Sequence, residues 1–497
     1  MEIFNQSELP GDHDQVVLEE DKLTALLLPC PTDFDGWTSL IAKIEKTSPD
    51  DIEKISLVYD SFLSEFPLCY GYWKKFAGHK ARLCTVGKVV EVYEQAVRSA
   101  TYSVDLWVDY CSFSMLLFED PVDIRRLFER GISFVGKDYL CHLLWDKYIE
   151  FEYSQKQWSF LAHIYLRTLK FPTRKLHNYY DSFKKLATIW EEQAEFYTNG
   201  VSELPSVALS NAGTRDITAY GDPEISVVIK DILNPALCLD RHSALQKYLF
   251  IGEEYYLKAG QIEAKIHCFE SRIRRSYFHV KPLDISQLEN WHQYLEFVEV
   301  QGDFDWTVKI YERCLIPCAG YPEFWMRYVN FVETWGGREI AVFALARAAQ
   351  IYVKKVPEMH RFIAIFKEKI GDVCGSRAAY RHFDSNLGLD FIENVKREAN
   401  LEKRQGNCAR ALNIYEKAIE RAKEIQSSNI LSILYVNFSR FKYTTVYGTN
   451  DVNKECDPID DAYWGIEEEI DDEEEQIATA MEVSKNSGHM GASTWLT

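Results

Sequence analysis

Two acidic stretches near the C-terminus carry side chains that could hold a divalent cation. Asp460 and Asp461 resemble the start of a diphosphate-binding DDxxD motif, but Ala462–Trp464 follow and the last acid of the motif is missing. The acidic run 471–475 could also bind a cation through its carboxylates. The alternative is a solvated acidic tail, and the long acidic flanks favour it for both stretches.

Cysteine and histidine offer little catalytic or metal-binding chemistry in this sequence. The 12 cysteines include no CxxC pair, and the closest pair, Cys314 and Cys318, has no His cluster at zinc-ligand spacing nearby. This pattern predicts free thiols in a reducing compartment and no metal site. His142, His163 and His292 are expected to be capping or surface residues. Since GxGxxG, P-loop, nucleophile-elbow and HExxH motifs are also absent from the sequence, we predict no catalytic residue and no cofactor.

Basic residues form two local clusters in an otherwise acidic chain. Arg272, Arg274 and Arg275, with His279 and Lys281 beyond them, could contact RNA or an acidic partner. The second cluster consists of Lys74, Lys75, Lys80 and Arg82. A solvated helix face is the alternative interpretation of each. The net charge of −20 argues against broad binding to nucleic acid or membrane surfaces, but it leaves room for one basic patch.

The aromatic residues follow a recurring pattern that predicts helix pairs. Each full copy begins with Trp and has further aromatic residues three and six positions later, which places the rings on one side of a helix. The copies are Trp107, Tyr110 and Phe113; Trp145, Tyr148 and Phe151; Trp291, Tyr294 and Phe297; Trp325, Tyr328 and Phe331; and the shorter Trp73 and Phe76.

A second marker follows each Trp after 20 or 21 residues and predicts the second helix of the pair. The markers are Tyr93, Phe128, Tyr165, Tyr311 and Leu345. Successive Trp residues are 34 to 38 positions apart within each group. A period of this length with two helical markers is typical of an α-solenoid, in which one helix pair covers the apolar stripe of the next.

We therefore predict an all-α solenoid whose aromatic residues form the core between helices. Weaker copies extend the array: Trp37 with Tyr59, Tyr180 with Phe183, Tyr248 with Phe269, a degenerate second helix at 377–382, a helix at 391–404 followed by Tyr415, and a last helix through Tyr435 and Phe441. An aromatic-rich helical enzyme, such as a terpene-cyclase-like fold, is the alternative. The constant spacing of the markers argues against it.

Composition predicts five segments. Residues 1–32 form an N-terminal segment that is partly disordered, 33–198 a first repeat block, and 199–235 a linker rich in Gly, Ser, Pro and Asn. Residues 236–447 form a second repeat block, and the acidic segment 448–497 is mostly disordered. The acidic N-terminus is unlike a secretory signal, and no segment has the length of a membrane span.

The Trp and Tyr-Glu-Arg pattern resembles the half-a-TPR, or HAT, repeat of RNA-processing scaffolds. Longer stretches are similar to the pre-mRNA-processing factor 39 family, especially to its plant members. They are FPLCYGYWKKFAGHKARL (66–83), SVDLWVDYCSF (103–113), LWDKYIEFEYSQ (144–155), FWMRYVNFVETWGGREIAVFALARAAQIYVK (324–354), ENVKREANLEKRQGN (393–407) and LYVNFSRFKY (434–443). The similarity covers roughly residues 33–443.

The resemblance implies a nuclear, non-enzymatic scaffold that associates with the U1 small nuclear ribonucleoprotein and helps it recognise the 5′ splice site. Its partners would be U1 proteins and other splicing factors, with indirect or local RNA contact. The alternative within the same class is a HAT scaffold for 3′-end cleavage or ribosomal RNA processing. Family members pair through further helices after the equivalent of 434–443, where this sequence turns acidic. Homodimer or paralogue pairing is therefore left open for this chain.

Overall fold

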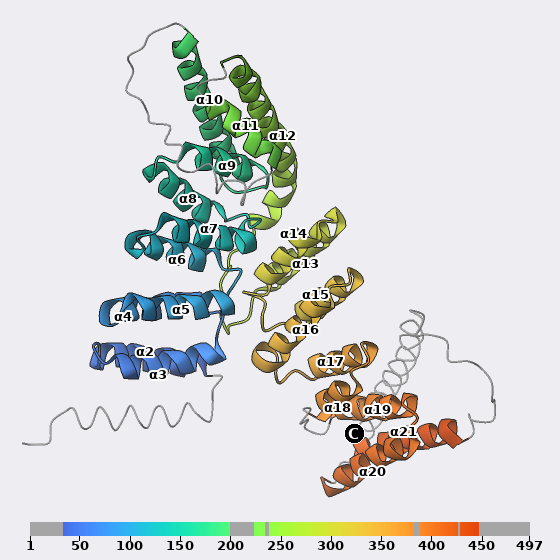
Figure 1. The fold of residues 1–497 in the computed structure, drawn as a ribbon. Coiled ribbons are helices and arrows are strands. Elements are labelled where there is room, and N and C mark those ends of the chain that lie inside the picture. The colour runs from blue at the N-terminus through green and yellow to red at the C-terminus, as the bar shows by residue number, and fades with distance from the viewer. Residues whose placement is uncertain (1–32, 199–222, 234–237, 382–387, 426–427, 447–497) are drawn as a thin grey trace, which may run out of the picture. The chain divides into compact units, whose positions relative to one another are not determined.

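The computed structural model describes residues 33–198, 223–233, 238–381, 388–425 and 428–446. Within these ranges the regular elements are helices and there is no β-strand, which confirms the predicted all-α solenoid. None of the helices described is long and apolar enough to cross a membrane. The chain divides into two compact units, residues 1–383 and 384–497 (Figure 1). The residues 1–32 and 448–497, for which we predict disorder, lie outside the described residues.

The first unit begins with four antiparallel helix pairs, each an A helix followed by a B helix. They are α2 (Phe34–Thr47) with α3 (Ile52–Glu65), α4 (Tyr70–Leu83) with α5 (Val86–Ser99), α6 (Val104–Leu117) with α7 (Pro121–Val135), and α8 (His142–Ser154) with α9 (Trp158–Leu169). Asp side chains begin several of these helices: Asp33, Asp51 and Asp120 each accept a backbone N–H of the first turn. We call these four pairs the first array.

A second array of helix pairs follows later in the same unit. It comprises α13 (Ile285–Gln301) with α14 (Phe304–Cys314), α15 (Pro322–Thr334) with α16 (Arg338–Arg347) and the π-helical turn η3 (Ala348–Tyr352), and α17 (Pro357–Lys369) with α18 (Val373–Arg381). Gly302, Gly336 and Gly371 lie in the turns between A and B helices with positive φ, where only glycine avoids a steric cost. The α8–α9 turn places Lys156 in the same left-handed conformation, at φ 53°.

Between the arrays lie α10 (Leu176–Thr198), α11 (Pro223–Leu233) and α12 (Cys238–Glu270). The prediction of a linker over 199–235 is wrong for 223–233, because these residues form α11, which packs on α9 and α12. The predicted pair Tyr248 and Phe269 is also wrong, because one continuous helix, α12, contains both residues. The short apolar helix was missed because it directly follows 199–222, a stretch rich in Gly, Ser and Pro that favours loops.

The two arrays lie side by side within the first unit (Figure 1). We call their contact the seam. Lys137 pairs with Asp303 at 2.7 Å, Lys354 pairs with Glu65 at 2.8 Å, and Phe278 lies between the rings of Phe66 and Tyr352. Phe171 of the first array also packs edge-on against Trp306 of the second. The arrays therefore form one body, which a division of the sequence at the linker did not anticipate.

The second unit contains α19 (Leu389–Arg404), α20 (Cys408–Glu424) and α21 (Ser428–Val446). The ring of Tyr415 on α20 lies 5.6 Å from Phe438 and 5.2 Å from Phe441 on α21. These rings join a compact core with Leu434 and Ala411. The helices predicted at 391–404 and around Tyr415 and Tyr435 are therefore present.

Two glycines of α12 provide a matched test of the α10–α12 packing. A Cβ at Gly252 would lie 2.1 Å from the ring of Phe183, which is fully buried against Tyr248, whereas a Cβ at Gly260 meets nothing within 4 Å. We expect Gly252→Ala to destabilise the protein by about 1–3 kcal/mol through overpacking. Gly260→Ala should stabilise it by about 1 kcal/mol at most through helix propensity. Thermal unfolding of both variants checks this, and equal shifts would contradict the packing.

Candidate partner-binding surface

The residues predicted to form the repeat core lie between the helices. All of them are buried except Tyr165, which is half-buried. The buried residues are Trp73, Phe76, Tyr93, Trp107, Tyr110, Phe128, Trp145, Tyr148, Trp291, Tyr294, Tyr311, Trp325 and Tyr328. These rings are therefore unavailable to a partner, and they act by fixing the helices that carry exposed side chains.

Three of the second-marker rings, Tyr93, Phe128 and Tyr311, each pack against two aromatic rings of the next A helix. Tyr93 lies 4.8 Å from Tyr110 in a stacked arrangement, and Tyr311 lies 4.9 Å from Tyr328. Phe128 stacks on Tyr148 at 4.7 Å in the same way. This geometry explains why the sequence needs aromatic residues both at the marker and three positions after each Trp.

The indole N–H of three repeat Trp residues has a regular role. Trp73, Trp107 and Trp325 donate to the backbone oxygen six residues earlier, at 2.7–2.9 Å, and so hold the loop that enters the A helix. Trp291 differs from these three, because its Nε1 is buried and has no hydrogen-bond partner. The loop that precedes α13 therefore differs from the other inter-repeat loops.

A carboxylate node links consecutive repeats. In each node, a Glu next to the second marker accepts a hydrogen bond from the Tyr of the next A helix. The same Glu forms an ion pair with an Arg of the next B helix. The guanidinium of that Arg lies over the Trp ring of the next A helix. The nodes are Glu94 with Tyr110, Arg130 and Trp107; Glu129 with Tyr148, Arg167 and Trp145; Glu270 with Tyr294, Arg313 and Trp291; and Glu312 with Tyr328, Arg347 and Trp325.

The node residues occupy constant sequence positions, a signal that the analysis of Trp spacing missed. Glu stands one residue after the marker and Arg stands two residues after it, as in Phe128-Glu129-Arg130 and Tyr311-Glu312-Arg313. The first marker of each node series has only the Glu, as at Glu270, and the last has only the Arg, as at Arg167. Reading these two positions therefore locates the ends of each node series.

Arg313 joins one node to the seam. Its guanidinium forms a bidentate pair with Glu270, at 2.6 and 2.8 Å, and its Nε lies 3.1 Å from Asp138 Oδ2 of the first array. All three side chains are less than 10% exposed. Burial raises the pKa of the Asp138 carboxyl, and the charge of Arg313 opposes that shift. One buried cation therefore serves carboxylates from α12 and from the turn after α7.

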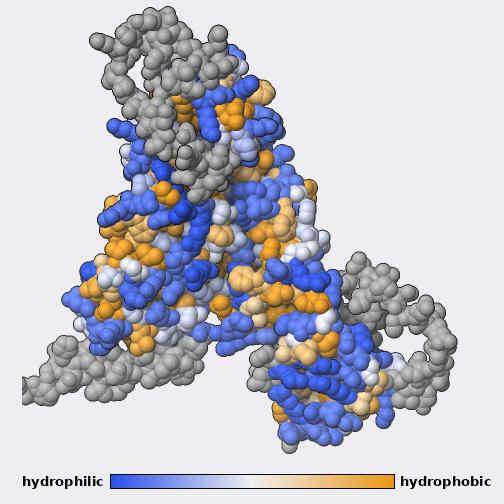
Figure 2. Space-filling model, in the orientation of Figure 1, coloured by the Kyte–Doolittle hydropathy of each residue, from blue (hydrophilic) through white to orange (hydrophobic). Residues whose placement is uncertain are grey.

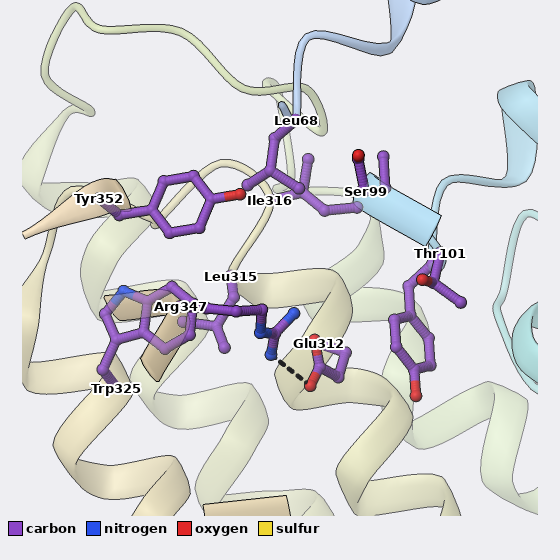
Figure 3. A pocket seen from close by; sticks show the side chains of 11 residues that line it. Leu68, Ser99, Thr101, Glu312, Leu315, Ile316, Trp325, Arg347 and Tyr352 are labelled. Carbon is purple, nitrogen blue, oxygen red and sulfur yellow. Dashed lines mark hydrogen bonds and ion pairs between the residues drawn. The ribbon is translucent and has the colours of Figure 1, made fainter. Parts of the chain in front are cut away.

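A small pocket opens on the seam, lined by Leu68 and Ser99–Tyr102 from the first array and by Glu312, Trp325, Arg347 and Tyr352 from the second. Figure 3 shows that the side chains of Arg347 and Glu312 point toward each other across it, with their ion pair drawn as a dashed line. The pocket has room for about one water molecule. We therefore assign it to the packing of the two arrays.

Four of the histidines and cysteines singled out in the sequence, His142, His163, Cys314 and Cys318, are buried. The prediction that His142 and His163 are capping or surface residues is wrong, since both are buried; burial lowers the pKa of His163 to about 4. Cys314 and Cys318 are fully buried, and burial raises the pKa of the Cys314 thiol. The described ranges contain no group of three His, Cys, Asp or Glu residues that could hold a metal ion.

The two basic clusters differ in what surrounds them. In the second cluster, Lys74 pairs with Asp109 and Arg82 lies near Asp50, while Lys75 and Lys80 lie over aromatic rings. Arg272, Arg274 and Arg275 lie in the loop 271–284 between α12 and α13. Arg272 and Arg274 are exposed and Arg275 is half-buried. Figure 2 shows a largely hydrophilic face with separate hydrophobic patches, among them patches over α4–α7 and over α15–α16.

Comparison with known proteins places this architecture in a family. The model of the PRP39 N-terminal HAT repeat matches residues 21–185, and the model of the PRP39 C-terminal HAT repeat matches residues 264–404. Together these matches span more than half of the chain and contain all four carboxylate nodes. The chain belongs to the PRP39 family.

Curated relatives of this PRP39-family chain carry names from splicing. Pre-mRNA-processing factor 39-2 of Arabidopsis thaliana is 50% identical over 87% of this chain and 42% of that protein. Pre-mRNA-processing factor 39 of Schizosaccharomyces pombe is 32% identical over 74% of this chain and 61% of that protein. The U1 small nuclear ribonucleoprotein component PRP42 of Saccharomyces cerevisiae is 24% identical over 61% of this chain and 55% of that protein. The chain thus spans about half the length of these relatives.

Removal of the shared cation should destabilise this PRP39-family fold strongly. We expect Arg313→Met to cost about 3–5 kcal/mol, because Asp138 and Glu270 would be left buried without a cation. The matched control is Arg126→Met, since Arg126 is 66% exposed and pairs only with Asp123 on the same helix. It should change stability by about 0.5 kcal/mol or less. Urea unfolding at neutral pH measures both, and similar midpoints for the two variants would contradict the buried node.

Glu94 should contribute stability that depends on pH. The hydrogen bond from Arg130 lowers the pKa of Glu94 below its usual value of 4.5, against the effect of burial. The unfolded chain therefore takes up the proton first as pH falls. We expect the stability gap between wild type and Glu94→Gln to be full at pH 7, and to close as pH falls through the lowered pKa. The exposed Glu91 on the same helix provides the control Glu91→Gln. A gap that is constant from pH 7 to acid would refute this assignment.

Proposed function

We propose that this chain is a non-enzymatic scaffold in pre-mRNA splicing that acts in the nucleus. It associates with the U1 small nuclear ribonucleoprotein and helps it recognise the 5′ splice site through protein–protein contacts. The relatives named pre-mRNA-processing factor 39 support the splicing role. The relative named as a U1 component supports the proposed association with the U1 particle.

The structural observation that carries the proposal is the burial of the large aromatic side chains between the helices. The large rings of the repeats are buried in stacked pairs and carboxylate nodes. What the repeats offer to solvent is a succession of charged helix faces and loop edges with single apolar side chains such as Leu116, Tyr153 and Trp335. Helical repeat arrays use such extended surfaces to hold other proteins.

The charge of the chain supports protein partners over extended RNA. The chain as a whole has a net charge of −20, which disfavours extended contact with a phosphate backbone. Protein segments with basic residues are attracted by the same field. We therefore propose that the principal partners are proteins of the U1 particle and other splicing factors, and that RNA contact is local.

Affinity purification tests the proposal directly. The full tagged chain is recovered from nuclear extract, with the tag alone as the control, and the bound RNA is sequenced. We expect enrichment of U1 RNA over U2 RNA and nucleolar RNA. After nuclease digestion, U1 proteins should stay bound, because protein contacts hold them. Recovery of 3′-end cleavage factors or of nucleolar particles in place of U1 would instead support the alternative HAT scaffold function.

A further inference from the structure

The loop 271–284 is held firmly although it contains no regular element. The side chain of Gln287 accepts the N–H of Arg274 at 3.0 Å and donates to the carbonyl of Arg272 at 2.6 Å. At the far end of the loop, the N–H of Leu283 donates to the Tyr321 hydroxyl at 2.6 Å. These contacts with α13 and with the residue before α15 fix both ends of the basic segment.

The middle of the loop is fixed by side chains of both arrays. The ring of Phe278 packs between Phe66 and Tyr352, at 6.3 and 6.2 Å, and the ring of His279 lies 4.9 Å from Phe34. The imidazole Nδ1 of His279 also accepts the N–H of Lys281 at 3.0 Å. A ligand of this loop would therefore meet side chains on a backbone that is already ordered, which lowers the entropic cost of binding.

The cations of this loop gather without the carboxylate partners that many other cations of the described residues have. Among the described residues, no carboxylate pairs with Arg272, Arg274 or Lys281. The Nη1 of Arg275 donates to the Pro282 carbonyl at 3.5 Å, but its Nε and Nη2 atoms are buried without a hydrogen-bond partner. Each guanidinium presents several N–H donors suited to phosphate or carboxylate oxygens. Three exposed cations beside these unpartnered donors, on one ordered loop, indicate a site for an anion.

An exposed aromatic ring in the same loop distinguishes between kinds of anion. Tyr277 follows the arginines and is 47% exposed. Single-stranded RNA combines phosphates with base faces, and proteins bind it with cations next to exposed aromatic rings. An acidic peptide would use the cations and leave the ring without a role. The ring therefore favours RNA over an acidic protein segment.

We propose that the loop 271–284 binds single-stranded RNA, with Arg272, Arg274 and Lys281 on the phosphates and a base stacked on Tyr277. This inference deepens the proposed function by naming a local RNA contact for a scaffold that otherwise binds proteins. The expected affinity is modest, since only three exposed cations take part.

Fluorescence anisotropy with the full chain tests the site. The probe is a labelled oligouridylate of about 12 nucleotides, since single-strand sites span about 4–16 nucleotides. Three phosphate contacts predict a log–log salt slope of about −2, which is about a 20-fold loss of affinity between roughly 50 and 200 mM salt. In Arg272→Glu/Arg274→Glu the slope should fall to about −0.7, with much weaker binding. Tyr277→Ala should lose about tenfold in affinity.

Matched controls separate the site from general charge and from unfolding. Lys185→Glu/Lys247→Glu makes the same charge change at two exposed lysines on α10 and α12 and should bind the probe like wild type. Tyr153→Ala removes a ring that is 64% exposed elsewhere and should have no effect. Circular dichroism melting of each variant verifies the fold. Equal losses in the loop variant and the lysine control would overturn the proposal, as would a wild-type chain that does not bind the probe at low salt.

A polyglutamate peptide in the same assay tests the other class of ligand. If the peptide binds with the same sensitivity to Arg272→Glu/Arg274→Glu and the oligouridylate does not, the loop is a docking site for an acidic protein and the RNA proposal is wrong. The purified assay is independent of recovery of the U1 particle. A loop variant that loses RNA but still recovers U1 proteins after nuclease treatment would support both proposals. A wild-type chain that binds the probe but recovers no U1 proteins would refute only the proposed function.

Discussion

A carboxylate shared by consecutive repeats is the interaction on which the rest of this structure depends. Apolar packing fixes the register of one helix pair against the next through shape alone, since dispersion has no preferred direction. The node adds a directional contact, because Glu129 must face both the hydroxyl of Tyr148 and the guanidinium of Arg167. Each node thus fixes the register of one pair against the next. The Trp below the guanidinium adds a cation–π contact, at 5.1 Å for Arg167 and Trp145.

The same chemistry also joins the two arrays. Glu270 ends α12 and begins the node series of the second array, and its partner Arg313 reaches Asp138 in the first. A buried ion cluster contributes little net stability compared with apolar packing, but it penalises every arrangement that leaves one charge without a partner. It therefore selects one relative placement of the arrays within the first unit. Two more exposed ion pairs also favour this placement of the arrays, Lys137 with Asp303 and Lys354 with Glu65.

Much of this fold could be predicted from the sequence, because ring spacing reports directly on helix faces. The Trp residues and their markers predicted the four pairs of the first array, the pairs α13–α14 and α15–α16 of the second, and the burial of rings such as Trp107 and Tyr328, but they gave no signal for α17. Long-range contacts could not be predicted in this way. Nothing in the local pattern shows that Asp138 faces Arg313, since 175 positions separate them and the pairing depends on how α10–α12 turn the chain. Helix α11 was missed because it is short and follows a stretch rich in breakers.

The candidate site, like the fold, could be predicted only in part from the sequence. The basic residues of the loop 271–284 were the best candidate in the sequence, but the α4 cluster was a second one, and a solvated helix face was the alternative for both. Only the structure separates them, because Lys74 has Asp109 as a partner whereas Arg272 and Arg274 have none among the described residues. Gln287 and Tyr321 fix the loop backbone, and no hydrogen bond to another described residue comes from the guanidinium groups of Arg272 or Arg274, so these two groups are not needed to hold the described part of the fold. Stability alone therefore gives no reason for these two arginines, whereas recognition of an anion does.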